Sequence, residues 1–553
     1  MTPEQLSDAI VDALNALVAA GTVSLPEVPT RVVVERPKVK EHGDYATNVA
    51  LQLGKKAGIA PRDLAAALAG QLAEAPGVGS VEVAGPGFLN VRVDTGSQGV
   101  LAGEVVRAGS AYGRSDALAG RAINLEFISA NPTGPLHLGH TRWAVVGDAL
   151  ARVLTAAGAR VSTEFYINDR GSQMDKFGAS LMAVANGEDV PEDGYHGAYV
   201  ADLAAEVVEA VPGIRELPAD EQLVAFREKG YELQLAHQKA DLATFRTIFD
   251  VWFSERSLVE SGAVDRALAV LQKEGHVYEA DGATWMRTTD FGDDKDRVLI
   301  RSNGDMTYFA SDTAYYLDKR LRGFDQCLYL LGADHHGYVG RLQAMAACAG
   351  DEPSYNLQVL IGQLVKILAD GEELKLSKRA GTLVTLTELV DLIGVDALRY
   401  TLARHPVDSP LTIDVAEVTR QSAENPVYYV QYAHARLSSI LRNAADLGLV
   451  PAPDAADLSL LSTAREGSLL RALAEFPRMV ARAAELHEPH RVARYLEDTA
   501  SAFHKFYDEC RVLPQGDEEP QPIHAARLVL VDATRTVLAN GLELLGVSAP
   551  ERM

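Results

Sequence analysis

The residues with the clearest chemical potential lie in the segment NPTGPLHLGH at 131–140. A β-rich apolar run, AINLEFIS (122–129), precedes this segment, and a stretch with helical periodicity follows it. Open α/β sheets bind nucleotides at such a turn, because the first N–H groups and the positive dipole end of the helix face the phosphates. His137 and His140 can reach the same side of the turn, and Gly139 lets a flat base or ribose approach the backbone.

Three other interpretations of the two histidines stay open at this point. Histidines at i and i+3 can bind zinc, although HLGH lacks the glutamate of HExxH and no cysteine lies nearby. They can also be buried or helix-capping residues. Finally, an HxGH turn occurs in several kinds of nucleotidyltransferase that act on an α-phosphate.

A second motif, LKLSKRAGT at 374–382, is a basic, glycine-containing loop that follows the last strand-like segment. A short basic run by itself is often a solvated surface loop. Together with HLGH on a Rossmann-like pattern, however, KLSKR resembles the KMSKS loop of class I aminoacyl-tRNA synthetases. That resemblance implies attack of an amino-acid carboxylate on the α-phosphorus of ATP, with catalysis by positioning and electrostatic stabilisation.

The resemblance also assigns roles to residues of both motifs. His137 and His140 would donate hydrogen bonds to the phosphates, and Lys375 and Lys378 would neutralise the leaving pyrophosphate. These four are the candidate catalytic residues. The candidate ATP-binding residues are Pro132, Gly134, His137, Gly139, His140, Lys375, Ser377 and Lys378. The loop departs from KMSKS at Leu376 and Arg379, and the sequence assigns no role to Arg379.

The periodicity along the chain predicts an α/β fold: a Rossmann-like parallel-sheet catalytic domain flanked by two smaller domains. We expect a small N-terminal α/β domain over 1–110 and the catalytic domain over 111–395. A largely helical stretch at about 175–290 has no place in a regular βαβ series and is predicted to be an insertion. From 396 to 553 the pattern predicts an all-helical bundle.

The composition is that of a soluble globular chain of 553 residues, with 47% hydrophobic and 23% charged residues. The net charge of -24 argues against indiscriminate nucleic-acid binding but allows local basic clusters. The three cysteines form no CxxC pair, so we expect no structural zinc. No uninterrupted apolar run is long enough to span a membrane, and the N-terminus is unlike a signal peptide, so we expect a cytoplasmic protein.

Further motifs narrow the resemblance to the arginyl-tRNA synthetases and extend it over nearly the whole chain. The narrowest signals are EHGDYATNVAL (41–51) near the start and LELLGVSAPERM (542–553) at the end, with YINDRGSQM (166–174) and GADHHGYVGR (332–341) between them. The resemblance implies that L-arginine, ATP with Mg²⁺, and tRNA-Arg give arginyl-tRNA, AMP and pyrophosphate. It also implies a monomer that does not associate with membranes.

A guanidinium is planar and always charged, so its pocket needs carboxylates and flat acceptors. Tyr308 and Asp312, four residues apart on a predicted helix, can offer a ring and a carboxylate together, although a helix-surface pair is the alternative. The family resemblance places six residues in the arginine pocket. They are Glu126, Asn131, Glu255, Tyr308, Asp312 and His335, of which Glu255 and His335 are the less direct matches. A metal site at His335 and its neighbours lacks a partner at suitable spacing.

The two terminal domains resemble the family's tRNA-binding domains. Around HGDYATN, Tyr45 and Asn48 could meet sugar or base edges, beside nearby lysines and arginines. In the C-terminal bundle, Tyr428, Tyr432 and Arg436 could stack on and hold single-stranded RNA. A structural turn, or tyrosines packed in the core, is the alternative for each.

Three competing functions remain to be weighed. Cysteinyl-tRNA synthetases share a similar helical domain but select their substrate with zinc, for which this sequence shows no fitting ligand set. A synthetase-like binding protein without catalysis has no need of both HLGH and KLSKR. A small-molecule nucleotidyltransferase does not account for the long C-terminal helical region.

Overall fold

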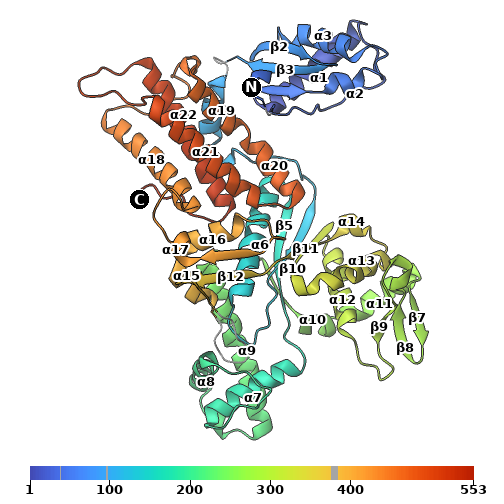
Figure 1. Ribbon diagram of the computed structural model, residues 1–553. Coiled ribbons are helices and arrows are strands. Elements are labelled where there is room, and N and C mark those ends of the chain that lie inside the picture. The colour runs from blue at the N-terminus through green and yellow to red at the C-terminus, as the bar shows by residue number, and fades with distance from the viewer. Residues whose placement is uncertain (38, 95–97, 375–383) are drawn as a thin grey trace.

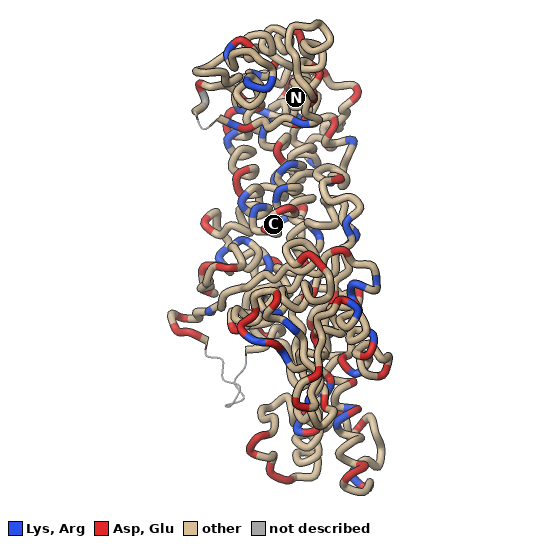
Figure 2. The backbone as a smooth tube through the Cα atoms, turned by 90° about the vertical axis from the view of Figure 1, so that its right-hand side faces the viewer, with Lys and Arg blue, Asp and Glu red and all other residues tan. Residues whose placement is uncertain are grey.

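A computed structural model describes residues 1–37, 39–94, 98–374 and 384–553. The molecule is elongated, with the N-terminal domain at one end and the helices α7 to α9 at the other (Figure 1). The central parallel sheet and the C-terminal helices lie between these ends. Acidic and basic residues are interspersed along its whole length (Figure 2).

The N-terminal domain is a three-stranded antiparallel sheet, in the order β1-β3-β2, packed against helices. Both helices and strands are present, as expected for a small α/β domain, and β2 and β3 pair across the turn at Gly85-Pro86-Gly87. The segment RVVVERP forms only a single bridge, between Glu35 and Ala46, and is not a strand of the sheet. The elements are α1 (Pro3–Ala19), β1 (Tyr45–Thr47), α2 (Val49–Leu53), α3 (Pro61–Leu72), β2 (Val78–Ala84) and β3 (Phe88–Val93).

The centre of the molecule is a five-stranded parallel sheet in the order β11-β10-β4-β5-β6. Every residue of β4 is buried, as expected for a parallel strand covered on both faces. The strands are β4 (Ala122–Glu126), β5 (Arg160–Ile167), β6 (Val251–Ser254), β10 (Gln326–Gly332) and β11 (Leu357–Gly362). The helices that connect or cover them are α5 (Val100–Ala108), α6 (Leu138–Ala156), α12 (Tyr308–Leu321), α13 (Val339–Cys348) and α14 (Pro353–Asn356).

The predicted insertion at 175–290 is not continuous. Its first part is helical, comprising α7 (Ser172–Asn186), α8 (Ala198–Ala210) and α9 (Ala219–Thr244). The chain then returns to the main sheet as β6, which pairs in parallel with β5 through Glu164↔Val251 to Ile167↔Ser254. A second segment outside the main sheet follows. It comprises α10 (Glu255–Glu260), α11 (Ala263–Glu274), β7 (Val277–Ala280), β8 (Ala283–Met286) and β9 (Arg297–Ile300). A four-residue strand between helices is too short for periodicity to reveal it.

A short β-strand also lies beyond the expected boundary at 395, in the part of the chain predicted to be all-helical. β14 (Leu411–Asp414) pairs in parallel with β12 (Val365–Ala369), and β13 (Glu372–Glu373) completes that small sheet. The buried Arg142 side chain of α6 ties this region down by donating to the carbonyl oxygens of Gln363, Pro406 and Ser409 at 2.8–2.9 Å. The helices around this sheet are α15 (Leu386–Ile393), α16 (Val395–Ala403) and α17 (Val415–Val418).

The remainder of the chain is helical, as predicted. The five helices are α18 (Pro426–Asp446), α19 (Ala464–Ala474), α20 (Phe476–Leu486), α21 (His490–Glu509) and α22 (Pro522–Leu544). Short 3₁₀ turns elsewhere cover Lys40–His42, Gly109–Ala111, Ile214–Glu216, Thr288–Phe291, Ala333–Tyr338 and Leu458–Leu460. Among the described residues, no helix is long and apolar enough to cross a membrane.

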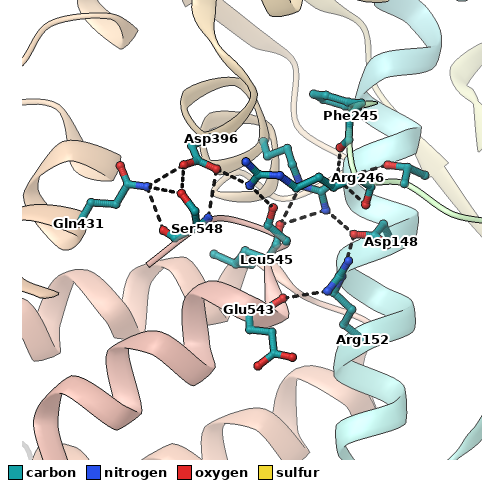
Figure 3. A network of polar contacts seen from close by, with 12 residues as sticks. Asp148, Arg152, Phe245, Arg246, Asp396, Gln431, Glu543, Leu545 and Ser548 are labelled. Carbon is teal, nitrogen blue, oxygen red and sulfur yellow. Dashed lines mark hydrogen bonds and ion pairs between the residues drawn. The ribbon is translucent and has the colours of Figure 1, made fainter. Parts of the chain in front are cut away.

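A buried polar network joins α6 of the central domain to α16 and to the segment that follows α22 (Figure 3). At its centre the fully buried Arg399 of α16 pairs with Asp148 of α6. The Arg399 guanidinium also donates to the carbonyl oxygens of Phe245 at 2.8 Å and Leu545 at 3.1 Å. Asp396, one turn earlier in α16, accepts hydrogen bonds from Gln431 and Ser548. Buried hydrogen bonds and an ion pair therefore hold α6 and the C-terminal helical region together.

Candidate active site

The turn 131–140 lies between the carboxyl end of β4 and the start of α6, as the sequence predicts. The backbone after β4 is strained, because Ile128 and Ser129 have positive φ values of 69° and 46°. The chain then turns back, and His137 is the N-cap of α6. The first turn of this helix therefore points its N–H groups toward the carboxyl edge of the sheet.

The two histidines of the turn stack on each other, with ring centroids 3.9 Å apart. Nδ1 of His137 accepts the N–H of Gly139 at 3.1 Å, and Nδ1 of His140 accepts the N–H of His137 at 3.3 Å. A neutral imidazole that accepts at Nδ1 carries its hydrogen on Nε2. The same contacts that cap α6 thus make both rings Nε2–H donors, which suits an anionic ligand. The capping and ligand-binding interpretations are compatible.

The helices of the insertion support this turn from outside. The side-chain amide of Gln238 in α9 donates to the carbonyl oxygens of Asn131 at 3.1 Å and Gly134 at 2.8 Å. The Tyr199 hydroxyl of α8 donates to the carbonyl oxygen of Thr133 at 3.2 Å. Sequence analysis missed these two residues, because nothing near them in the chain links them to a turn about 70 to 100 residues earlier.

Three predicted residues of the basic loop, Lys375, Ser377 and Lys378, lie outside the described residues, as does Arg379. The chain just after the loop is attached to the histidine turn. The N–H of Leu138 donates to the carbonyl oxygen of Val384 at 3.3 Å, and the N–H of Leu386 donates to that of Leu136 at 2.9 Å. The segment that follows KLSKR is thus hydrogen-bonded to HLGH, although 235 or more residues separate the two motifs.

Glu126 is the last residue of β4 and only 7% exposed. Its Oε2 forms an ion pair of 2.6 Å with the Lys319 ammonium, and its Oε1 accepts the Ser129 hydroxyl at 2.9 Å. The carboxylate is therefore fixed at both oxygens. Ser129, held in its unusual backbone conformation, also accepts the N–H of Tyr166 at 3.2 Å.

Asp312 lies on the first turns of α12, where its carboxylate accepts the hydroxyl of Tyr338. Burial raises the pKa of Asp312 to about 6, against an ordinary value of 3.8, and the negative charge of Glu126 adds to the rise. The Arg341 cation opposes it. Tyr308, four residues earlier, is 77% exposed and presents its ring to the surface of the site.

Glu255 follows β6 directly and is 4% exposed. Burial raises the pKa of its carboxyl, and the charges of Asp169 and Asp312 act in the same direction while Arg170 opposes them. The hydroxyl of Tyr166 lies beside Glu255, and its own pKa is raised by burial and then by Glu255, Asp312 and Glu126. Three carboxylates, from β4, α10 and α12, therefore act on one tyrosine of β5.

The other two predicted pocket residues are more open. Asn131 is exposed at the start of the turn, and His335 is an exposed residue of the 3₁₀ turn after β10, 3.6 Å from the Asp334 carboxylate. The His335 charge also acts on Asp312. Among the described residues, no group of three or more His, Cys, Asp or Glu side chains could hold a metal ion.

The predicted RNA-contacting residues differ in their accessibility. Tyr45 belongs to the core of the N-terminal domain and is 1% exposed, so its ring is not on a surface that a nucleotide could reach. Its position on β1 explains this, because Tyr45 and Thr47 share the inner face of the strand. Asn48, the next outward residue, is exposed and accepts the side-chain amide of Gln52.

In the helical bundle, Tyr428 and Tyr432 of α18 stack with ring centroids 6.1 Å apart and planes 9° apart. Tyr432 is 39% exposed, whereas Tyr428 is half-buried. The Arg436 guanidinium lies 5.8 Å from the Tyr432 ring and 4.2 Å from the Tyr507 ring of α21. The three predicted residues lie on α18 and, together with Tyr507 of α21, form one aromatic and cationic group.

Comparison with known proteins covers the whole chain. Family models described as the arginyl-tRNA synthetase N-terminal domain, the class I (R) tRNA synthetase catalytic domain and the DALR anticodon binding domain match residues 4–93, 106–403 and 430–553. Arginine–tRNA ligases of Kineococcus radiotolerans and Frankia alni are 59% and 57% identical, with all of each chain covered. The arginyl-tRNA synthetase of Thermus thermophilus superposes with a TM-score of 0.76 at 25% identity over both full chains. The catalytic-domain model alone matches more than half of the chain and the two ligases match over its full length, so this chain belongs to the arginyl-tRNA synthetase family.

Proposed function

We propose that the carboxyl edge of the five-stranded sheet is where this chain activates L-arginine. The reaction is that of the family: the arginine carboxylate attacks the α-phosphorus of ATP, giving arginyl-adenylate and pyrophosphate. A terminal ribose hydroxyl of tRNA-Arg then displaces AMP, giving arginyl-tRNA. The observation that carries the proposal is that Glu126, Glu255 and Asp312 all act on Tyr166, while the histidine turn follows β4, the strand that ends in Glu126. Carboxylates suit a guanidinium, whereas the N–H groups of a helix N-terminus suit the phosphates of ATP.

The ATP side of the site is the turn 131–140. His137 and His140 donate from Nε2 to the phosphates, which is supported by the contacts at both Nδ1 atoms. Gly139 and Gly134 allow close approach of the nucleotide, with Pro132 shaping the turn. Lys375, Ser377 and Lys378 bind the leaving pyrophosphate; the attachment of the chain after the loop to Leu136 and Leu138 supports that role.

The arginine side combines charge and flat surfaces. Asp312 and Glu255 bind the guanidinium, and the exposed ring of Tyr308 covers it. Glu126 and Asn131 hold the α-amino and carboxylate end, close to the ATP turn. His335 completes the pocket from the turn after β10.

The terminal domains hold the tRNA. We propose an N-terminal tRNA-binding unit over 1–110, with Asn48 among its contacts, and an anticodon-binding bundle in which Tyr428, Tyr432 and Arg436 contact unstacked bases. Between them lies the catalytic domain from 111 to about 395, extended by β14.

Mg²⁺ reaches the site bound to the phosphates of ATP and neutralises their charge. We further propose that the chain works as a monomer in the cytoplasm, where arginyl-tRNA is consumed. Sedimentation at micromolar concentration tests the monomer, and a dimer there would contradict it.

Aminoacylation tests the function directly. The purified chain is incubated with ATP, Mg²⁺, tRNA and one of arginine, cysteine or glutamate. Only arginine should be attached to tRNA. Attachment of either other amino acid, or of none, would refute the proposed function.

A further inference from the structure

One face of α12 carries a stripe of functional residue types along its full length. Tyr308, Asp312, Tyr315 and Lys319 follow one another at spacings of four, three and four, and Arg322 caps the same stripe at the end of the helix. The first two belong to the proposed arginine pocket. Tyr315 and Lys319 are buried, Arg322 is partly exposed, and the function described above gives none of the three a role.

Lys319 is 0% exposed, so its ammonium has no access to water. Its Nζ contacts Glu126 Oε2 at 2.6 Å and lies 4.2 Å and 4.0 Å from the ring centroids of Tyr315 and Tyr329. A buried cation is tolerated only when its lost hydration is replaced, and here one carboxylate and two aromatic faces replace it. The two rings therefore fix the ammonium, and the ammonium fixes one oxygen of Glu126.

The three carboxylates of the proposed pocket differ in whether a nearby cation balances their negative charge. In the described part of the chain, neither Asp312 nor Glu255 has an ion-pair partner within 4 Å, whereas the charge of Glu126 is balanced by Lys319. L-arginine brings a cation at each end. The carboxylates without an ion-pair partner, Asp312 and Glu255, are therefore those proposed to bind the guanidinium. Glu126 is instead held in place by Lys319 as an acceptor for the α-ammonium group.

We propose that Lys319 is a positioning residue for arginine recognition: it orients Glu126 and balances its charge so that this carboxylate can accept the substrate's α-ammonium. The inference rests on the proposed function, in which Glu126 contacts arginine. Lys319 itself touches no substrate and is not a catalytic residue.

A neighbouring ion pair provides a matched control. Glu164 on β5 is the register partner of Glu126, is 0% exposed and is bound by both Nη atoms of Arg322 at 2.7 and 2.9 Å. Asn124 and Tyr315 donate to the same carboxylate. The two carboxylates are both buried and lie on neighbouring strands, but the Arg322 side chain is 29% exposed whereas that of Lys319 is fully buried. The Arg322–Glu164 pair includes no proposed substrate contact, so it controls for the loss of a cation beside this sheet.

The experiment compares Lys319→Met, Glu126→Gln and the double variant, together with Lys319→Arg, in aminoacylation assays with tRNA. Lys319→Met should raise the KM for arginine roughly tenfold, the effect of removing one charged hydrogen bond, and leave the KM for ATP unchanged. In the Glu126→Gln background the same substitution should add nothing, because the group that Lys319 positions is already altered. Lys319→Arg, which keeps the cation, should recover part of the loss.

The outcomes distinguish a failure of the role proposed for Lys319 from a failure of the proposed arginine pocket. An equal rise on replacing Lys319 in both backgrounds, or an equal rise from Arg322→Met, would make the effect structural and overturn the role of Lys319. Glu126→Gln without any effect on the KM for arginine would instead remove Glu126 from the proposed pocket. If Lys319→Met does not fold, the double variant, in which the buried pair is neutral, is compared with Glu126→Gln. A higher KM for arginine in the double variant would then overturn the inference.

Discussion

Replacing Asp312 by Asn should make the free protein more stable and its recognition of arginine worse. Burial raises the pKa of this carboxyl from 3.8 to about 6. Below pH 3.8 the group is protonated in both the folded and the unfolded chain and has no net effect. Above pH 6 it is ionised in both, and the folded state then carries a cost of up to about 3 kcal/mol, since one pKa unit corresponds to about 1.4 kcal/mol.

Asparagine has nearly the same shape and can still accept the Tyr338 hydroxyl, but it carries no charge. The midpoint of thermal unfolding of Asp312→Asn should therefore exceed that of the unchanged chain at pH 7.5, and the difference should shrink toward pH 4. The exposed Asp265 in the first turn of α11 gives a control, because Asp265→Asn should leave the midpoint unchanged or lower it slightly at pH 7.5, but not raise it.

The same substitution should raise the KM for arginine about 10- to 100-fold, because a charged hydrogen bond to the guanidinium contributes roughly 1.5–3 kcal/mol. In the unchanged chain, kcat/KM for arginine should fall as pH drops through about 6, since a protonated Asp312 cannot pair with the guanidinium. The pKa of Glu255 is also raised, so Asp312→Asn should remove only part of this pH dependence. An unchanged KM together with an unchanged or lower unfolding midpoint at pH 7.5 would refute the reasoning.

Four further predictions concern the rest of the molecule. ATP–pyrophosphate exchange should stay near background until tRNA is added, as the family resemblance implies; strong exchange without tRNA would contradict this. Gln238→Leu should raise the KM for ATP several-fold with little change in that for arginine, because two carbonyl groups of the turn lose their donor; equal changes in both would point to general damage. Arg399→Met should lower the free energy of unfolding, measured with urea, by about 3 kcal/mol, because Asp148 keeps only its second cation, Arg152, and the carbonyl oxygens of Phe245 and Leu545 lose their donor. Adding Asp148→Asn should recover part of that loss, and no recovery would show that the carbonyl contacts of Arg399 dominate. Arg436→Ala should raise the KM for tRNA, and more at high than at low salt, because Arg436 stacks on Tyr432 and Tyr507 and stacking is not screened by salt. A rise in KM that shrinks as salt increases would show instead that the contact is purely electrostatic.

Much of the fold could be predicted because its signals are local. The turn at 131–140 follows from a buried β-run, a glycine–proline break and helical periodicity, all within about 40 residues. The helical C-terminal region follows in the same way. The strand β6 could not be predicted, because four residues between helices carry no measurable period, and only pairing with β5 makes them a strand.

Residue types alone were a weaker guide to exposure. Tyr45 stands in a polar, glycine-containing segment that favours a surface position, yet the inward face of β1 places it in the core. Asn48, three residues later, is exposed in the same motif. Which side of a short strand faces outward depends on the helices that cover it, and the sequence does not indicate that by itself.

The sequence by itself determined the residue types on which the proposed chemistry rests: two histidines at a strand-to-helix turn, a basic loop, and carboxylates that could pair with a guanidinium. Only the tertiary structure decided how these groups are held. The donors that support the turn, Gln238 and Tyr199, and the cation that balances Glu126, Lys319, are about 65 to 195 residues away from their partners. Local motifs are readable because neighbouring residues share one element. Burial and charge compensation depend instead on which elements meet in space, and that is settled only when the whole chain has packed.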